Sequence, residues 1–139
     1  PVNSLLPIAL VLIASTAYGI WYQRTRGRVV VKGRAKKAGL ITAQMIGAEL
    51  GPRVTVVQFS SAFCTPCRAT RALISDVTAT MDDVKYVEID AEDQLELVRT
   101  LDIRSTPTTL FVDKKGNEVG RAMGAPKRAQ VLTAIDAIR

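Results

Sequence analysis

The two cysteines of this 139-residue chain, Cys64 and Cys67, are separated by two residues and lie between two different hydrophobic patterns. The segment before them, Val54 to Phe59, is β-branched and almost entirely apolar, which predicts a strand buried on both faces. The segment from Cys64 to Thr80 has its apolar residues at helical spacing. The pair therefore lies at the N-terminus of a predicted helix, where unpaired backbone N–H groups and the helix dipole favour a thiolate over a thiol.

Around this pair the chain alternates strand and helix patterns. Residues 41–50 predict a short strand or turn followed by a helix that ends at Gly51-Pro52. Later strands are expected over residues 84–89, 108–112 and 118–121, and later helices over residues 91–101 and from Pro126 onward. The order βαβαββα, read from residue 54, predicts an α/β fold with a mixed β-sheet that helices cover on both faces.

Two motifs within this pattern resemble those of the thioredoxin family. Cys64-Thr65-Pro66-Cys67 lies at the first strand–helix junction, and Ser105-Thr106-Pro107-Thr108 precedes the last hairpin. The resemblance covers residues 41–139 and implies a thioredoxin-like fold for them. It also implies that Pro107 is the family's cis-proline and that Thr106 contacts the backbone of a substrate peptide, which pairs there as an added strand. The alternative for Pro107 is an ordinary turn proline.

The resemblance implies a role for each cysteine. Cys64 would be the exposed nucleophile that forms a mixed disulfide with a protein substrate, and Cys67, one turn deeper, would resolve it. This chemistry uses protein disulfides or dithiols as partners and needs no cofactor beyond the redox-active disulfide. A purely structural disulfide is the alternative, but so small a loop would add little stability.

Four neighbours of the cysteines are expected to support the site. Pro66 fixes φ at the start of the helix and lacks an N–H that would be unsatisfied there. Arg68 either favours the thiolate through its positive charge or is a solvated side chain on the first turn. Phe63 and Thr65 stand where thioredoxin has a tryptophan and a glycine, so the reduction potential of the family cannot be carried over.

Gln58 is the main departure from the family pattern. It stands at the position of the buried aspartate that helps to take the proton from the resolving cysteine, and Tyr86 replaces the lysine that accompanies this aspartate. A glutamine can form hydrogen bonds but cannot accept a proton at neutral pH. We therefore expect a slower resolving step than in a cytosolic thioredoxin.

The composition excludes several other kinds of site. The chain has no histidine, which excludes a Ser-His-Asp or Cys-His arrangement and any histidine-ligated metal. Two cysteines cannot form a four-thiolate metal site within one chain, although a cluster shared across a dimer stays open. We therefore expect no metal and no bound cofactor.

Residues 1–23 contain no charged side chain, and Leu5 to Tyr22 form a nearly continuous apolar run. A helix of this length crosses most of a hydrocarbon core, with Trp21 and Tyr22 at the level of the headgroups. We expect a transmembrane anchor over residues 1–23. The alternative is a cleaved signal peptide, for which Ser15-Thr16-Ala17 resembles a cleavage site, but no basic region precedes the apolar run.

The positive net charge of +6 comes from one short segment after the apolar run. Seven Lys or Arg residues lie between residues 24 and 37, and the first acidic residue is Glu49. We interpret residues 24–40 as a basic juxtamembrane linker that contacts anionic lipid, in which Val29-Val30-Val31 could form a short strand or a packing contact. The positive-inside rule then places the soluble domain, residues 41–139, in the cytoplasm. A nucleic-acid partner is not expected, because the charge is not on the folded domain.

These patterns favour a single-pass, membrane-tethered thiol–disulfide oxidoreductase that works in the reductase direction. The alternative is an accessory subunit of a larger membrane complex, with small residues of the apolar run allowing helix packing and the thioredoxin-like domain serving for docking. A third hypothesis reverses the topology, and the dithiol would then serve cysteine oxidation, disulfide isomerisation or cytochrome maturation outside the cytoplasm.

Overall fold

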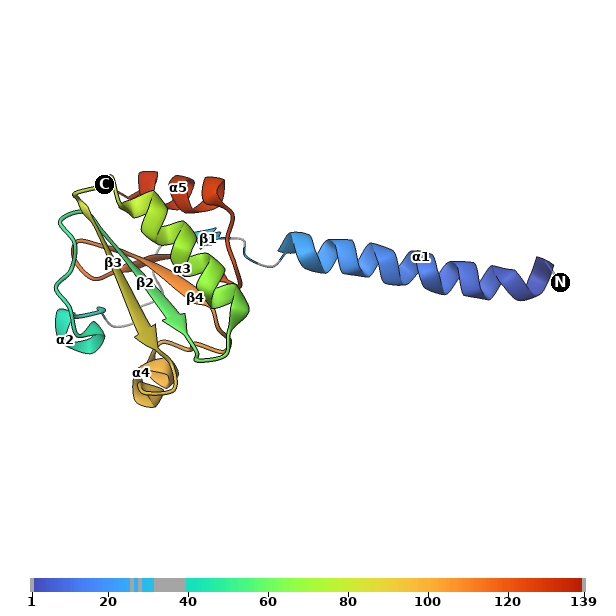
Figure 1. Cartoon of the computed structure of the whole chain (residues 1–139), viewed down its shortest axis with the longest axis horizontal. Helices are drawn as coiled ribbons and strands as arrows, with labels where there is room; N and C mark the ends of the chain where they lie inside the picture. Colours follow the sequence, from blue (N-terminus) through green and yellow to red (C-terminus); the bar gives the residue numbers. More distant parts are fainter. Residues whose placement is uncertain (1, 26, 28, 32–39, 139) are drawn as a thin grey trace.

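A five-stranded sheet with strand order β1-β5-β4-β2-β3 forms the centre of the folded domain. The computed structural model describes residues 2–25, 27, 29–31 and 40–138, and Figure 1 shows their arrangement. Strands β2 and β3 are parallel and the other neighbouring strands are antiparallel, so the expected mixed sheet is confirmed. The strands are β1 (Val29–Val31), β2 (Val54–Ser60), β3 (Val84–Asp90), β4 (Thr108–Asp113) and β5 (Glu118–Met123).

Helices cover both faces of the sheet, as predicted (Figure 1). The helices of the domain are α2 (Ala43–Ile46), α3 (Thr65–Thr78), α4 (Leu95–Thr100) and α5 (Arg128–Asp136). Helices α2 and α4 pack on the face that carries Val57 and Phe59 of β2. Helices α3 and α5 pack on the opposite face, against Val54 and Val56. Every residue of β2 is buried, because successive side chains of this central strand enter the two cores in turn.

The bounds of helices α2, α4 and α5 differ from the prediction. Helix α2 ends at Ile46 and not at Gly51-Pro52, because Gly47 adopts a left-handed conformation with φ 68° and its N–H bonds to the carbonyl of Ala43. Helix α4 starts at Leu95 and not at residue 91, since residues 91–93 form a turn in which the Asp90 side chain accepts the N–H of Glu92. Helix α5 starts at Arg128, two residues after Pro126.

Helix α1 (Val2–Thr25) contains 24 residues and has a mean hydropathy of 1.8 over its most apolar window. None of its residues is buried against the rest of the chain. The hydroxyls of Thr16 and Thr25 donate to the carbonyls of Leu12 and Trp21, so these two polar groups are satisfied within the helix. The helix is therefore long and apolar enough to cross a membrane, a property that signal sequences share.

The segment after α1 joins the sheet directly. Strand β1 lies within the predicted basic linker and pairs antiparallel with β5, with Val29 opposite Ala122. Before it, the N–H of Gly27 bonds to the carbonyl of Met123 at 2.7 Å. Gly27 has φ +81°, and a Cβ atom at this position would lie 2.2 Å from the carbonyl oxygen of Ala125. Only glycine fits such a contact. Residues 26, 28 and 32–39 of the predicted linker lie outside the described residues.

We predict that Gly27→Ala detaches this segment from β5. Its methyl group would meet main-chain atoms, and its positive φ adds about 1–2 kcal/mol of strain. Hydrogen exchange over residues 27–31 should become at least about tenfold faster, which corresponds to about 1.4 kcal/mol. Gly47→Ala is the matched control, because Gly47 also has a positive φ but an added Cβ would have no neighbour within 4 Å. Unchanged exchange in Gly27→Ala would contradict the prediction.

Candidate active site

Cys64 and Cys67 form a disulfide at the N-terminus of α3. Cys64 is the N-cap residue, and its sulfur accepts the backbone N–H of Cys67 at 3.2 Å. Pro66 occupies the first turn, where its missing N–H leaves no unpaired donor. Cys64 is half-buried, whereas Cys67 is 1% exposed and faces the sheet. The two sulfurs therefore differ in access: a bulky partner can reach Cys64 but not Cys67.

Gln58 lies directly beneath the buried cysteine. Its side chain is fully buried, and its amide nitrogen donates to the carbonyl of Cys67 at 3.0 Å and to the hydroxyl of Ser60 at 2.9 Å. Its amide oxygen accepts the hydroxyl of Tyr86 at 2.5 Å. Because a carbonyl can only accept, the bond to Cys67 fixes which way the amide points. All the polar atoms of Gln58 are thus satisfied, and none of them can take a proton.

Tyr86 connects Gln58 with an ion pair at the surface. Burial, together with the negative charge of Glu88, raises the pKa of the Tyr86 hydroxyl above its ordinary value, so this group remains a donor at neutral pH. Glu88 in turn accepts two hydrogen bonds from the guanidinium of Arg71 on α3. The site thus has charged groups at its rim and a neutral amide at its base.

The loop before β4 lies beside the dithiol. The Thr106-Pro107 peptide bond is cis, and Pro107 is buried. The hydroxyls of Thr106 and Ser61 are hydrogen-bonded at 3.0 Å, which joins this loop to the segment that leads into Cys64. The carbonyl of Pro107 accepts the N–H of Gly124 at 2.8 Å. Among the described residues, no hydrogen bond uses the backbone N–H or C=O of Thr106, so both groups can pair with an incoming strand.

A polar hollow of about 270 Å³ opens next to the disulfide. Its lining residues are Ser60, Ser61, Ala62, Cys64, Cys67, Arg68, Arg71, Glu88 and Asp90. Phe63, which directly precedes Cys64, has 98% of its surface exposed. A substrate that reaches Cys64 would meet this exposed ring and the charged groups that line the hollow.

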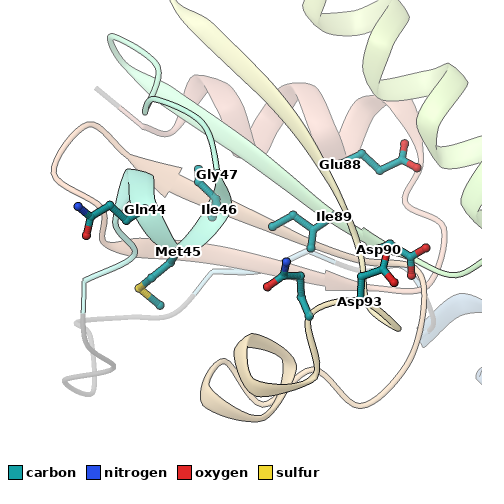
Figure 2. A pocket seen from close by; sticks show the side chains of 9 residues that line it. Gln44, Met45, Ile46, Gly47, Glu88, Ile89, Asp90 and Asp93 are labelled. Atoms are coloured by element: carbon teal, nitrogen blue, oxygen red, sulfur yellow. The ribbon is translucent and has the colours of Figure 1, made fainter.

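A second hollow lies on the other face of β3, between α2 and α4 (Figure 2). Asp90 and Asp93 lie on one side of it and Gln44 and Met45 on the other. It contains no cysteine. Within the described part of the chain, no group of three or more His, Cys, Asp or Glu side chains could hold a metal ion. We therefore assign no chemistry to this second hollow.

The structure brings most of the expected site residues together around the disulfide. Gln58 lies beneath it, Arg68 lines the hollow, and the Thr106-Pro107 loop lies beside it. Thr65 and Pro66 are exposed on the first turn of α3. Four further residues at the site were not predicted from the sequence: Ser60, Ser61, Arg71 and Glu88. Two of these could have been found, because Ser60 shares a strand face with Gln58 and Arg71 follows Cys67 by one helical turn.

This fold, with a Cys-x-x-Cys disulfide at the start of α3 and a cis-proline loop beside it, defines a thioredoxin-fold protein. The family model described as Thioredoxin matches residues 47–137. The chain therefore belongs to the thioredoxin family.

Thioredoxins with similar sequences and similar solved structures agree with this assignment to the family. Thioredoxin H5 of Oryza sativa subsp. japonica is 36% identical over 77 residues, which are 55% of this chain and 56% of that protein. Thioredoxin of Pongo abelii is 30% identical over 77 residues, 55% of this chain and 73% of that protein. The structure of reduced Schistosoma mansoni thioredoxin pre-protein matches with a TM-score of 0.55 and 28% identity, covering 63% of this chain and 80% of that one. The match spans just over half the length of the first of these relatives.

Proposed function

We propose that this chain is a membrane-tethered thiol–disulfide oxidoreductase that works mainly as a reductase. The observation that carries the proposal is the unequal access to the two sulfurs, with Cys64 half-buried and Cys67 1% exposed at the start of α3. Such a pair allows one sulfur to meet the substrate and keeps the other for the second step.

In the first step, the Cys64 thiolate attacks one sulfur of a substrate disulfide. The substrate S–S bond breaks, a mixed disulfide forms, and one substrate thiolate leaves. The Thr106 backbone positions the substrate by pairing with it as an extended strand, beside cis-Pro107. The N-terminus of α3 stabilises the negative charge on Cys64, since its sulfur already accepts the N–H of Cys67.

In the second step, Cys67 loses its proton and attacks the sulfur of Cys64. The mixed disulfide breaks, the second substrate thiolate leaves, and the Cys64–Cys67 disulfide forms, which is the state of this structure. Two electrons have then passed to the substrate, so an external dithiol must return them before the next cycle. Gln58 holds the Cys67 backbone in place but cannot accept its proton.

Helix α1 would anchor the domain in a membrane with the domain on the cytoplasmic side. The support for this is its length and hydropathy and the basic residues that follow it. Membrane lipid would then be a partner of the juxtamembrane segment. The cytoplasm keeps thiols reduced, which favours the reductase direction.

We predict that Cys64→Ser lowers insulin reduction by the full chain, with dithiothreitol as the electron donor, to the rate of dithiothreitol alone. In a separate reaction without added dithiol, pre-reduced Cys67→Ser should retain the first step and accumulate a mixed disulfide with insulin, because the resolving thiol is missing. Mass spectrometry of the trapped adduct and turbidity of reduced insulin measure the two effects. Equal turnover by the wild type and Cys64→Ser, above that of dithiothreitol alone, would contradict the proposal.

We predict that Gln58→Asp accelerates the second step. Burial would raise the pKa of the introduced carboxylate toward neutrality, where it can take the proton of Cys67. The resolution rate at neutral pH should rise by up to roughly 100-fold, the scale of a positioned general base. In the wild type, the rate should increase with pH as the Cys67 thiolate becomes populated, and the substitution should flatten this dependence.

Gln58→Asn is the matched control for this change, because it has the same size as aspartate but no titratable group. Stopped-flow release of a fluorescent thiol from the mixed disulfide, between about pH 6 and pH 9, measures the rate. If Gln58→Asn accelerates resolution as much as Gln58→Asp, proton transfer does not limit this step.

The topology is tested with one cysteine at a time in a chain that has Cys64→Ser and Cys67→Ser. Lys114→Cys lies on an exposed turn of the domain, and Asn3→Cys lies near the far end of α1. In intact cells, a membrane-impermeant maleimide should label Asn3→Cys but not Lys114→Cys, and permeabilised cells should label both. Labelling of Lys114→Cys in intact cells would place the domain outside the cytoplasm.

A further inference from the structure

The chain enters the sheet very close to the end of α1. Helix α1 ends at Thr25, and two residues later the N–H of Gly27 bonds to the carbonyl of Met123. Two residues span at most about 7 Å of extended chain. The end of α1 therefore remains within this distance of Gly27, whatever direction the helix takes from the domain.

The register of the sheet connects this entry point with the active site. Met123 pairs with Thr108, the residue after cis-Pro107, and Thr108 pairs with Phe59 near the end of β2. Neighbouring strands are about 4.8 Å apart, so about 14 Å separates β1 from β2. The tether, the substrate loop and the segment leading to Cys64 thus share one end of the sheet. In Figure 1, the first turn of α3 likewise lies on the side from which α1 extends.

An entry point at the other end would have placed the dithiol much farther from α1. Strand β2 has seven residues, and its length corresponds to about 20 Å. The opposite end of the sheet contains Val54 and the turn after Asp113. The positive φ of Gly27 and its contact with the carbonyl of Ala125 fix the entry at the active-site end.

Aromatic residues of α1 lie next to the substrate loop. Tyr18, Trp21 and Tyr22 line an apolar hollow of about 440 Å³, together with Thr25, Ser105 and Met123. Ser105 directly precedes Thr106, and Met123 is 53% exposed. Aromatic residues at the end of a membrane span lie at the level of the headgroups. The substrate loop is therefore held at the same level.

From these observations we infer that the active-site end of the domain faces the bilayer and that its substrates are disulfides in membrane proteins, within roughly 20 Å of the membrane surface. This inference rests on the proposed function and adds the substrate class to it. The reaction is the same exchange at Cys64 and Cys67. A short, fixed tether raises the effective concentration of such disulfides and leaves soluble proteins less access to the same face.

The test uses the full chain in lipid vesicles, reduced beforehand so that a single turnover needs no added reductant. Two single-span peptides serve as probes, each with a fluorescent thiol attached through a disulfide. In one peptide the disulfide lies about three residues beyond the membrane span, and in the other about 30 residues beyond it along an extended Pro-rich segment, up to about 90 Å away. We expect the near disulfide to be reduced at least roughly tenfold faster, as expected from a gain in effective concentration.

Two insertion variants show whether the fixed tether causes this preference. About ten Gly and Ser residues inserted directly after Thr25 add about 17 Å of flexible reach. This variant should lose most of the preference for the near disulfide. The same insertion after Arg34 is the matched control: it follows β1 in the chain, leaves the Gly27 to Met123 connection intact, and should retain the preference.

Each outcome bears on one hypothesis. Equal rates for the near and far disulfides in the unmodified chain would overturn the inference and leave the proposed function standing. A preference that survives the insertion after Thr25 would overturn the role of the fixed tether. If neither disulfide is reduced faster than by the Cys64→Ser chain, the proposed function itself fails.

Discussion

Burial of β2 on both faces is the constraint on which the site depends. This strand pairs with β3 and β4, and its side chains enter both cores, so any polar group on it must be satisfied inside the protein. Gln58 meets this requirement with three hydrogen bonds, to Ser60, Cys67 and Tyr86. A carboxylate in the same position would be costly to bury in its charged form. The neutral amide supports the cysteine loop but supplies no proton acceptor for the second step.

The sheet also relates the position of helix α1 to that of the active site. β1 pairs with β5, β5 with β4, and β4 with β2. This pairing places the entry of the chain, the cis-Pro107 loop and the end of β2 at one end of the sheet. A flexible linker would allow the domain to turn in any direction. The bond between Gly27 and Met123 leaves a single residue between this attachment and the end of α1. The class of substrate that we infer follows from this short connection.

Much of the fold was predictable because its signals are local. The apolar run of β2, the helical spacing of α3 and the hairpin between β4 and β5 each depend on residues adjacent in the chain. The ends of the short helices were predicted less well. Gly47 stops α2 four residues before Gly51, and this depends on a backbone conformation that the composition alone does not indicate.

By itself, the sequence determined that a Cys-x-x-Cys pair lies between a buried strand and a helix, and that an apolar helix long enough to cross a membrane precedes the domain. Tertiary structure decided what surrounds the pair. The hydroxyl of Tyr86 reaches Gln58 across 28 positions of the chain, and Ser61 reaches Thr106 across 45. The attachment of Gly27 to Met123 is likewise a contact between distant segments. Such contacts depend on the register of paired strands, which is set only when both faces of the sheet are buried together.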